Sequence, residues 1–176
     1  MLEVQDNFLD KNSFDRIQHL IAPLSLHPNE NPTFSWFYSI GIDFPEQVDR
    51  FQFTHSFYDH GTTQSPFTEW LDPILQKINP FAVSKIKANL LTNSSKIIKN
   101  GWHTDLDGLS GNPKLKEWTT GIFYLNTNNG YTEFKDGTKV ESVANRFISF
   151  PANLEHRGTT CTDEMIRVIL NLNYFI

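Results

Sequence analysis

The sequence predicts a mostly β protein of the α+β class, in which a layer of N-terminal helices packs on a β-sandwich or double-sheet jelly roll. From residue 81 onward, roughly seven or eight short runs rich in β-branched and aromatic residues alternate with turn residues. The dipeptides Asn129-Gly130 and Asp136-Gly137 are typical of tight hairpin turns. Aromatic residues make up 14% of the chain, with 15 Phe against 2 Met, which suits a sheet interior filled by flat, rigid side chains.

The length of 176 residues predicts a single domain over 1–176. We expect residues 1–80 to supply helices and a supporting strand, and residues 81–176 to form the jelly-roll core. Folding a chain of this mass buries on the order of 20,000 Å². A full core therefore needs no disulfide or metal to hold it together.

The first predicted helix follows Asn12 and Ser13, which are both good N-cap residues, and Pro23 ends it. Its apolar residues recur at spacings of three and four, and they are Phe14, Ile17, Leu20 and Ile21. This spacing gives the helix one apolar face to bury.

A second helical pattern runs from Ser65 to Asn79, and Pro73 is expected to kink it or split it. Between the helices, residues 32–44 read as an aromatic strand, and residues 51–61 read as irregular. The strands expected after the second helix are 81–92, 118–126, 131–135, 138–142, 145–151, 156–161 and 165–175.

Charge and composition exclude several classes of protein. The net charge is −5 and the basic residues are scattered, so a nucleic-acid partner is disfavoured. No apolar run approaches the roughly 18 residues that span a bilayer. The single cysteine, Cys161, and an N-terminus without signal-peptide features lead us to expect a reducing, cytoplasmic location.

Three residues form a candidate metal site. On an extended strand, His103 and Asp105 would point to the same side, and His156 follows several strands later. Two histidines and one carboxylate on one face of a metal are the arrangement of non-haem Fe(II) oxygenases. Asp107 is the competing carboxylate, but we expect it in the following loop.

Arg167 adds an anion-binding group to this candidate site. In a hairpin of this length, His156 and Arg167 can both face the interior of the barrel. A buried guanidinium needs a carboxylate partner. This predicts a dicarboxylate ligand that chelates the metal and pairs with Arg167; the alternative is that Arg167 pairs with Glu133 or Asp163.

Residues 87–174 resemble the Fe(II)/2-oxoglutarate-dependent dioxygenase superfamily, and more closely its prolyl-4-hydroxylase-like branch with small phage and marine bacterial members. The matching elements, in the family's order, are His103-Thr-Asp105, the strand 120–126, the turn and strand 130–134, the strand 146–151, His156 and Arg167. The full set is specific, although each part alone is not.

The resemblance implies a double-stranded β-helix in which His103, Asp105 and His156 hold Fe(II) and Arg167 holds the C5 carboxylate of 2-oxoglutarate. Tyr124 matches a family tyrosine whose hydroxyl reaches the same carboxylate. Other candidate pocket residues are Asn93, which stands where prolyl hydroxylases often have a tyrosine, Asn89, which competes with it, Asn171 and Asn173.

The resemblance also implies an enzyme that uses 2-oxoglutarate and O₂ to hydroxylate an acceptor. Prolyl residues of a peptide or protein are the favoured acceptor, and small molecules stay open. Residues 107–117 are a candidate lid, and the aromatics Trp36, Phe37 and Tyr38 either contact substrate or belong to the core. The rival interpretations are a cupin-type metalloenzyme without 2-oxoglutarate and a non-catalytic β-sandwich.

Overall fold

The computed structural model describes residues 1–22, 34–42, 50–106 and 113–176. Its helices are α1 (Lys11–Ile21), α2 (Asp72–Ile78) and two 3₁₀ turns, Thr68–Leu71 and Pro113–Glu117. Its strands are β1 (Glu3–Gln5), β2 (Phe37–Ile40), β3 (Phe51–Asp59), β4 (Thr62–Thr63), β5 (Ala82–Thr92), β6 (Thr119–Tyr124), β7 (Tyr131–Phe134), β8 (Lys139–Glu141), β9 (Arg146–Pro151), β10 (His156–Gly158) and β11 (Ile166–Phe175). Among these residues, no helix is long and apolar enough to cross a membrane.

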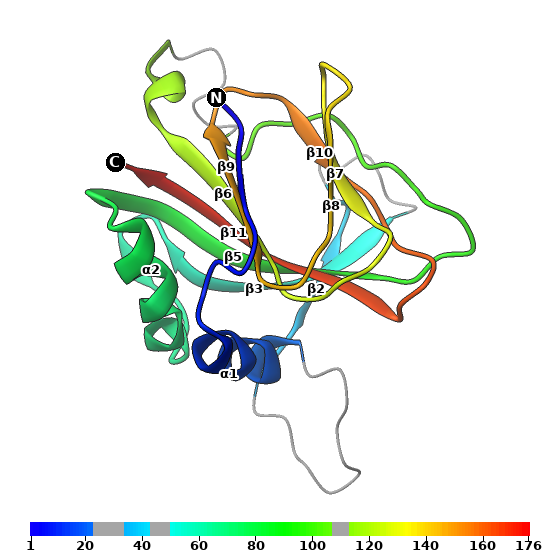
Figure 1. Cartoon of the computed structure of the whole chain (residues 1–176), viewed down its shortest axis with the longest axis horizontal. Coiled ribbons are helices and arrows are strands. Elements are labelled where there is room, and N and C mark those ends of the chain that lie inside the picture. The colour runs from blue at the N-terminus through cyan, green and yellow to red at the C-terminus, as the bar shows by residue number, and fades with distance from the viewer. Residues whose placement is uncertain (23–33, 43–49, 107–112) are drawn as a thin grey trace, which may run out of the picture.

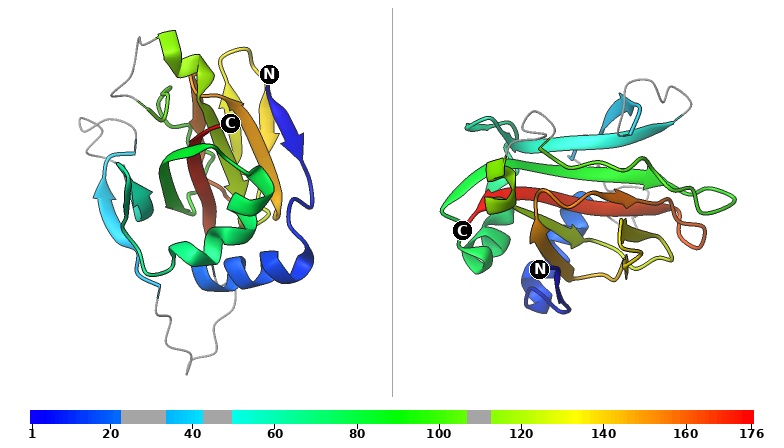
Figure 2. Two further views of the ribbon diagram at one scale, coloured as in Figure 1. Left: turned by 90° about the vertical axis from the view of Figure 1, so that its left-hand side faces the viewer. Right: turned by 90° about the horizontal axis from the view of Figure 1, so that it is seen from above.

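The strands form two antiparallel sheets, as in a jelly roll. The larger sheet has the order β1-β9-β6-β11-β5-β3-β2, with β4 paired to β3, and the smaller has the order β10-β7-β8. The smaller sheet lies on one side of the larger, and α1 and α2 lie on the other (Figure 1). Figure 2 shows the long strands β5 and β11 running side by side through the middle of the molecule.

Alternation along the central strands separates an apolar face from a polar one. On β5, Ile86, Ala88 and Leu90 are buried in the core that the helices cover. Lys85, Lys87 and Asn89 alternate with them and line a cavity on the opposite face. A smaller apolar cluster lies between the two sheets and contains Ile122, Tyr124, Phe134, Val140, Ile148 and Phe150. The two sheets therefore enclose both a small core and a polar cavity.

The first helix occupies the predicted place, but its predicted cap is wrong. The N-cap is Asp10, whose carboxylate accepts a hydrogen bond from the Ser13 backbone N–H at 3.1 Å. Phe14, Ile17 and Ile21 are buried as the spacing predicts. Asp10, Asn12 and Ser13 are all residue types that favour the N-cap position, so the sequence alone does not show which of them caps the helix.

Pro73 splits the second helical segment, which confirms one of the two predicted outcomes. A 3₁₀ turn, Thr68–Leu71, precedes α2, and Pro73 lies in the first turn of α2, where its missing N–H is harmless. The helix ends at Asn79, which takes the left-handed conformation with φ of 51°.

Residues 51–61 are not irregular, and this prediction is wrong. Residues 51–59 form β3, which pairs with both β2 and β5. Polar side chains such as Gln52 and His55 are buried in this strand, so its pattern lacks the apolar alternation of an ordinary strand. β1 was also not predicted, because a three-residue edge strand carries little pattern.

Only one of the two predicted hairpin turns exists. Asp136-Gly137 joins β7 to β8, and Gly137 has φ of +90°. Asn129-Gly130 lies between β6 and β7, which belong to different sheets, so the predicted hairpin there is wrong. Gly130 is required for packing instead, since a Cβ atom on it would meet Cδ of Arg167 at 2.7 Å.

Candidate metal centre

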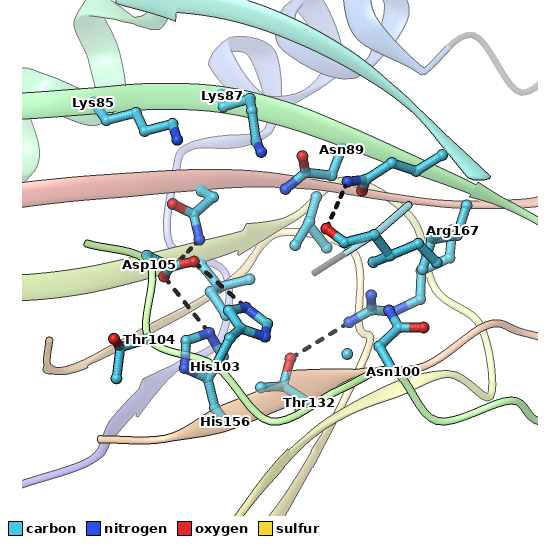
Figure 3. A pocket seen from close by; sticks show the side chains of 17 residues that line it. Lys85, Lys87, Asn89, Asn100, His103, Thr104, Asp105, Thr132, His156 and Arg167 are labelled. Atoms are coloured by element: carbon cyan, nitrogen blue, oxygen red, sulfur yellow. Dashed lines mark hydrogen bonds and ion pairs between the residues drawn. The ribbon is translucent and has the colours of Figure 1, made fainter. Parts of the chain in front are cut away.

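A cavity of about 150 Å³ lies against the polar face of the larger sheet. Its charged and amide-bearing side chains come from β3, β5, β10, β11 and the segment between β5 and β6 (Figure 3). These side chains are Gln52, Lys85, Lys87, Asn89, Asn100, His103, Asp105, His156, Arg167 and Asn171. The cavity is therefore far more polar than the two apolar clusters that flank it.

The structure brings His103, Asp105 and His156 together. One nitrogen or oxygen atom from each lies within 4.8 Å of the others. Nε2 of His103 is 3.6 Å from Oδ1 of Asp105, and Nε2 of His156 is 3.5 Å from Oδ2. The two histidines also exchange backbone hydrogen bonds of 3.0 Å, so the separation of their Cα atoms is fixed.

The local backbone differs from the predicted strand. His103 forms an isolated β-bridge with His156, and Asp105 lies in a turn. The carboxylate thus reaches the histidines through a bend of the chain instead of through the period-two alternation of a strand. Asp107, the competing carboxylate, lies outside the described residues.

Hydrogen bonds to carbonyl groups orient both imidazole rings. Nδ1 of His103 is 3.2 Å from the Gly101 carbonyl, and Nδ1 of His156 is 3.2 Å from the Leu154 carbonyl. A carbonyl oxygen only accepts, so each Nδ1 carries a proton and each Nε2 faces Asp105. Histidine binds a metal through Nε2 when its Nδ1–H is held by a carbonyl in this way.

Asp105 is held as a carboxylate. Burial alone would raise its pKa, but His156 and His103 and the hydrogen bond from Asn171 hold the pKa well below its usual range. Nδ2 of Asn171 donates to Oδ2 of Asp105 at 2.9 Å. A negatively charged oxygen and two imidazole lone pairs on one side of a point make a three-ligand metal site with open positions.

Arg167 is a buried cation in the same cavity. Its side chain is 2% exposed, Nε donates to Ser142 Oγ at 2.8 Å and Nη2 to Thr132 Oγ1 at 3.4 Å (Figure 3). Burial lowers the pKa of its guanidinium. Across the described chain, no carboxylate lies within salt-bridge distance of it. A buried guanidinium held by two hydroxyl groups is unneutralised, so this end of the cavity favours an anion.

The protein acids proposed as alternative partners of Arg167 are engaged elsewhere. Glu133 accepts from Arg157 Nη2 at 2.7 Å and from Lys99 at 3.2 Å, and the Asp163 carboxylate accepts from the Asn129 backbone N–H at 3.0 Å. The alternative prediction is therefore wrong.

The predicted hairpin between His156 and Arg167 is also wrong, although both residues reach the cavity. β10 pairs with β7 in the smaller sheet, and β11 pairs with β5 and β6 in the larger one. His156 and Arg167 meet because the two sheets face each other, not because they share a hairpin.

Of the other residues predicted to contact the cosubstrate, some line the cavity and some lie outside it. Tyr124 is fully buried beside Arg167, and its hydroxyl donates to Thr132 Oγ1 at 2.8 Å, so Thr132 and not Tyr124 lines the cavity. The structure does not bring Asn93 to the cavity, because Asn93 is exposed and its amide donates to the Glu164 carbonyl. Asn89 and Asn171 do line the cavity. Asn173 is bonded to Thr120 Oγ1 instead.

Sequence reasoning missed Thr132, Ser142 and Asn100 at this site. Thr132 lies on β7 and Ser142 directly follows β8, while Asn100 precedes the metal-binding segment and its Oδ1 is buried without a hydrogen-bond partner. Nothing in the local sequence distinguishes these small polar residues from ordinary strand and turn residues. They can be identified only from the structure, in which the two sheets face each other and bring these residues to one site.

Two further predictions concern the surroundings of the cavity. Most of the candidate lid lies outside the described residues, and its end forms the 3₁₀ turn Pro113–Glu117. Trp36 packs against the core, whereas Phe37 and Tyr38 are both 61% exposed. Neither Phe37 nor Tyr38 lines the cavity.

Comparison with known proteins relates this chain to others through structure. No family model and no curated protein matches the sequence. An oxidoreductase of the 2-oxoglutarate–Fe(II) oxygenase family from Burkholderia pseudomallei superposes with a TM-score of 0.67 and 11% identity, covering 99% of this chain and 84% of its own.

Two further solved structures have the same architecture. A Trichoplax adhaerens prolyl hydroxylase, in complex with a peptide of the hypoxia-inducible factor, gives a TM-score of 0.62 and 12% identity, with 99% and 83% covered. HygX from Streptomyces hygroscopicus, with nickel and 2-oxoglutarate bound, gives 0.59 and 11%, with 99% and 82% covered. The chain therefore has the jelly-roll fold of the 2-oxoglutarate–Fe(II) oxygenases.

Proposed function

We propose that the protein is an Fe(II)- and 2-oxoglutarate-dependent oxygenase that hydroxylates an acceptor. The observation that carries this proposal is the pairing of an unneutralised, buried Arg167 with a His-Asp-His cluster in one cavity. A metal site alone would serve many chemistries. A metal site and a buried guanidinium together fit a ligand with a chelating group at one end and a carboxylate at the other.

The residues present fit a divalent metal. His103, Asp105 and His156 would hold Fe(II), because both imidazoles are bonded to carbonyl groups through Nδ1 and turn Nε2 toward Asp105, whose carboxylate is ionised. When bound, Fe(II) supplies the activation of O₂ that no amino-acid side chain provides. Asn171 keeps Oδ2 of Asp105 in place through its amide.

Arg167 would bind the C5 carboxylate of 2-oxoglutarate. Ser142 and Thr132 fix the guanidinium through their hydroxyl groups, so its fork is oriented before the ligand arrives. Thr132 itself also lines the cavity. Tyr124 holds the Thr132 side chain in place by donating a hydrogen bond to its hydroxyl group. The pocket amide that we favour for a contact to the cosubstrate is Asn89, not Asn93.

Part of the cavity wall is apolar. Leu91, Ile122 and Ile169 line the cavity from the larger sheet. A low local dielectric strengthens the ion pair between Arg167 and a bound carboxylate.

The structural relatives support this assignment and leave the acceptor open. HygX has been solved with nickel and 2-oxoglutarate, and also with hygromycin B, which is a small molecule. The Trichoplax enzyme binds a peptide. The prolyl acceptor and the cytoplasmic location stay predictions.

The test is anaerobic visible absorption of metal-stripped protein, titrated first with Fe(II) and then with 2-oxoglutarate. We expect a charge-transfer band that requires both additions and is lost in Arg167→Ala. Lys96→Ala, a change at an exposed residue outside the cavity, is the control and keeps the band. Iron binding without any band would remove 2-oxoglutarate from the proposal and favour a cupin-type metalloenzyme.

A further inference from the structure

The two histidines of the metal-binding cluster are joined through their backbones by an isolated β-bridge. His103 and His156 each donate a backbone N–H to the carbonyl of the other at 3.0 Å. The next bridge along the same segment joins Lys99 to Thr159, and it is also isolated. Isolated bridges restrain a segment less than a continuous ladder does, so side-chain contacts beside them matter for the spacing of the two imidazoles.

Trp102 and Arg157 form such a contact directly beside the bridge. Since His103 lies opposite His156 in an antiparallel pair, Trp102 lies opposite Arg157. Side chains alternate between the two faces, so this pair points away from the cavity that the imidazoles line, and neither member of it lines that cavity. Cζ of Arg157 is 4.1 Å from the centroid of the Trp102 ring, which is a close cation–π contact.

The smaller sheet holds the Arg157 guanidinium in this position. β10 and β7 lie side by side (Figure 1), and Arg157 is opposite Glu133 in their register. Nε and Nη2 of Arg157 both donate to Oε2 of Glu133, at 2.8 and 2.7 Å. Oε1 of Glu133 accepts from Lys99 Nζ at 3.2 Å, and Lys99 belongs to the segment that carries His103. One carboxylate, 7% exposed, therefore binds both sides of the bridge.

A second cation lies on the Trp102 ring, but its contact is weaker. Nζ of Lys135 is 5.1 Å from the ring centroid, and the same ammonium pairs with Glu155 at 3.5 Å. The Lys135 side chain is 52% exposed, against 20% for Arg157. Cation–π contacts are stronger where the groups are shielded from water, so the Arg157 contact is the one that restrains Trp102.

We propose that Trp102 and Arg157 are positioning residues of the metal site, whose contact holds the bridge between His103 and His156 closed and so fixes the spacing of the two imidazoles. This inference rests on the proposed function, since it takes both histidines as metal ligands. Trp102 precedes one ligand in the chain and Arg157 follows the other. A change at either side chain therefore reaches an imidazole through one peptide unit.

The first measurement uses the metal-free protein. Amide hydrogen exchange of ¹⁵N-labelled protein is followed by NMR at the His103 and His156 N–H groups, which donate across the bridge. We expect both to exchange about two- to thirtyfold faster in Trp102→Ala, the range for the loss of one cation–π contact. Trp102→Phe keeps a ring for the guanidinium, so its rates should stay close to those of the unaltered protein. Amides of β6 and β9 should be unaffected.

The second measurement is a Co(II) titration followed by visible absorption. The Kd for Co(II) should rise about tenfold in Trp102→Ala, as it does when a partner behind a metal ligand is lost. The absorption maximum should also shift, since it reports the ligand geometry, which a change in stability alone does not move. Arg157→Met should have a similar effect, and the double variant no larger one, because both changes remove the same contact.

Arg146→Met is the matched control. Arg146 on β9 binds the Asp6 carboxylate through Nε at 2.6 Å, and its side chain is 18% exposed, close to the 20% of Arg157. The control therefore loses an ion pair of the same kind away from the bridge. We expect it to keep the exchange rates of the two histidine amides, the Kd for Co(II) and the absorption maximum. Far-ultraviolet circular dichroism shows that each variant has folded.

Four results are distinguishable. Unchanged exchange at the two histidine amides in folded Trp102→Ala refutes the restraint of the bridge. Faster exchange with an unchanged Kd and absorption maximum refutes the positioning role. Equal effects in Arg146→Met overturn the inference, because they reduce it to general stability. Failure of the unaltered protein to bind Co(II) refutes the proposed function, while the exchange rates of the metal-free protein still decide whether Trp102 and Arg157 hold the bridge.

Discussion

At the scale of single residues, Asn171 tests whether the metal-binding cluster depends on the residues behind it. Asn171→Ala removes the hydrogen bond that holds Oδ2 of Asp105 at 2.9 Å. Losing such an outer partner typically costs about 10- to 100-fold in metal affinity. We expect Fe(II) affinity to fall by about this factor, as measured by anaerobic titration, while the far-ultraviolet circular dichroism is unchanged.

Asn173 provides the control for this change. It lies two residues further along β11, is fully buried, and bonds Thr120 Oγ1 instead of a metal-binding residue. Asn173→Ala should lower the free energy of unfolding by roughly 1 kcal/mol and leave Fe(II) affinity unchanged. An equal loss of affinity in both variants would mean that Asn171 acts only through the stability of the strand.

The residues that could be predicted from the sequence are those whose partners are close in the chain. His103 and Asp105 are two residues apart, and Asn171 shares its strand face with Arg167, so spacing alone identified them as candidates. Thr132 and Ser142 touch Arg167 from the other side of the barrel. No local pattern encodes that contact, because it depends on how two sheets pack.

At the scale of the elements, His55 bonds β3 to Ser35 and Ser65, and it makes the free energy of unfolding depend on pH. Its Nδ1–H donates to the Ser35 carbonyl at 2.6 Å, and Nε2 accepts from Ser65 Oγ at 2.7 Å. Burial lowers the pKa of this imidazole below its ordinary value of 6.5. The unfolded chain therefore takes up the proton more readily, so His55 favours folding above about pH 6.5 and this contribution is lost as the pH falls below that value.

The measurement is urea unfolding of the protein and of His55→Gln at pH 7.5 and pH 5.5. Glutamine does not titrate, so the free energy of unfolding should fall less in the variant than in the unaltered protein over this interval. All other titratable groups are the same in both proteins. Identical falls would show that His55 does not bring about the pH dependence.

A substitution at Gly121 on β6 is expected to disturb the core and to leave the cavity intact. A Cβ atom there would lie 2.6 Å from Cζ of Phe147 and 3.1 Å from Cε1 of Tyr174, so these buried rings must move. We expect Gly121→Ala to lower the free energy of unfolding by about 1–3 kcal/mol in urea. Its neighbour Ile122 faces the cavity, so the Fe(II) and 2-oxoglutarate band should survive in the folded variant. An unchanged stability would mean that the rings have room to move.

The same alternation explains why β3 was missed while β5 was predicted. Along β5, large apolar residues alternate with polar ones, which is the usual signature of a half-buried strand. Along β3, buried Gln52 and His55 break that alternation, because this strand satisfies polar groups on both of its faces. Hydropathy cannot separate a polar residue that is buried and bonded from one that is exposed.

At the scale of the whole molecule, the jelly roll was predictable and the pairing within it was not. The number and spacing of short strands limit the choice to sandwiches and barrels. The connection of β10 to β11 between different sheets is set by long-range packing, and reading it as a hairpin was wrong. The predicted site residues nevertheless come together, because facing sheets bring residues of distant strands to one cavity.

This architecture predicts that ligands stabilise the whole fold. His156 lies on the smaller sheet, Arg167 lies on the larger one, and His103 and Asp105 lie on the segment that pairs with β10. Metal and 2-oxoglutarate would therefore add contacts between the two sheets across the cavity. A ligand at 100 times its Kd adds about 2.7 kcal/mol to the free energy of unfolding. For a chain of this length, that raises the melting temperature by roughly 5–10 °C.

Differential scanning calorimetry under anaerobic conditions measures the rise, with Fe(II) added first and 2-oxoglutarate second. Each addition should raise the melting temperature of the unaltered protein. Asp105→Ala should abolish both increments, because without the metal the cosubstrate loses its chelating end. Arg167→Ala should keep the first increment and lose most of the second. If 2-oxoglutarate stabilised Arg167→Ala as much as the unaltered protein, the guanidinium would have no part in holding it, and the role proposed for Arg167 would be wrong.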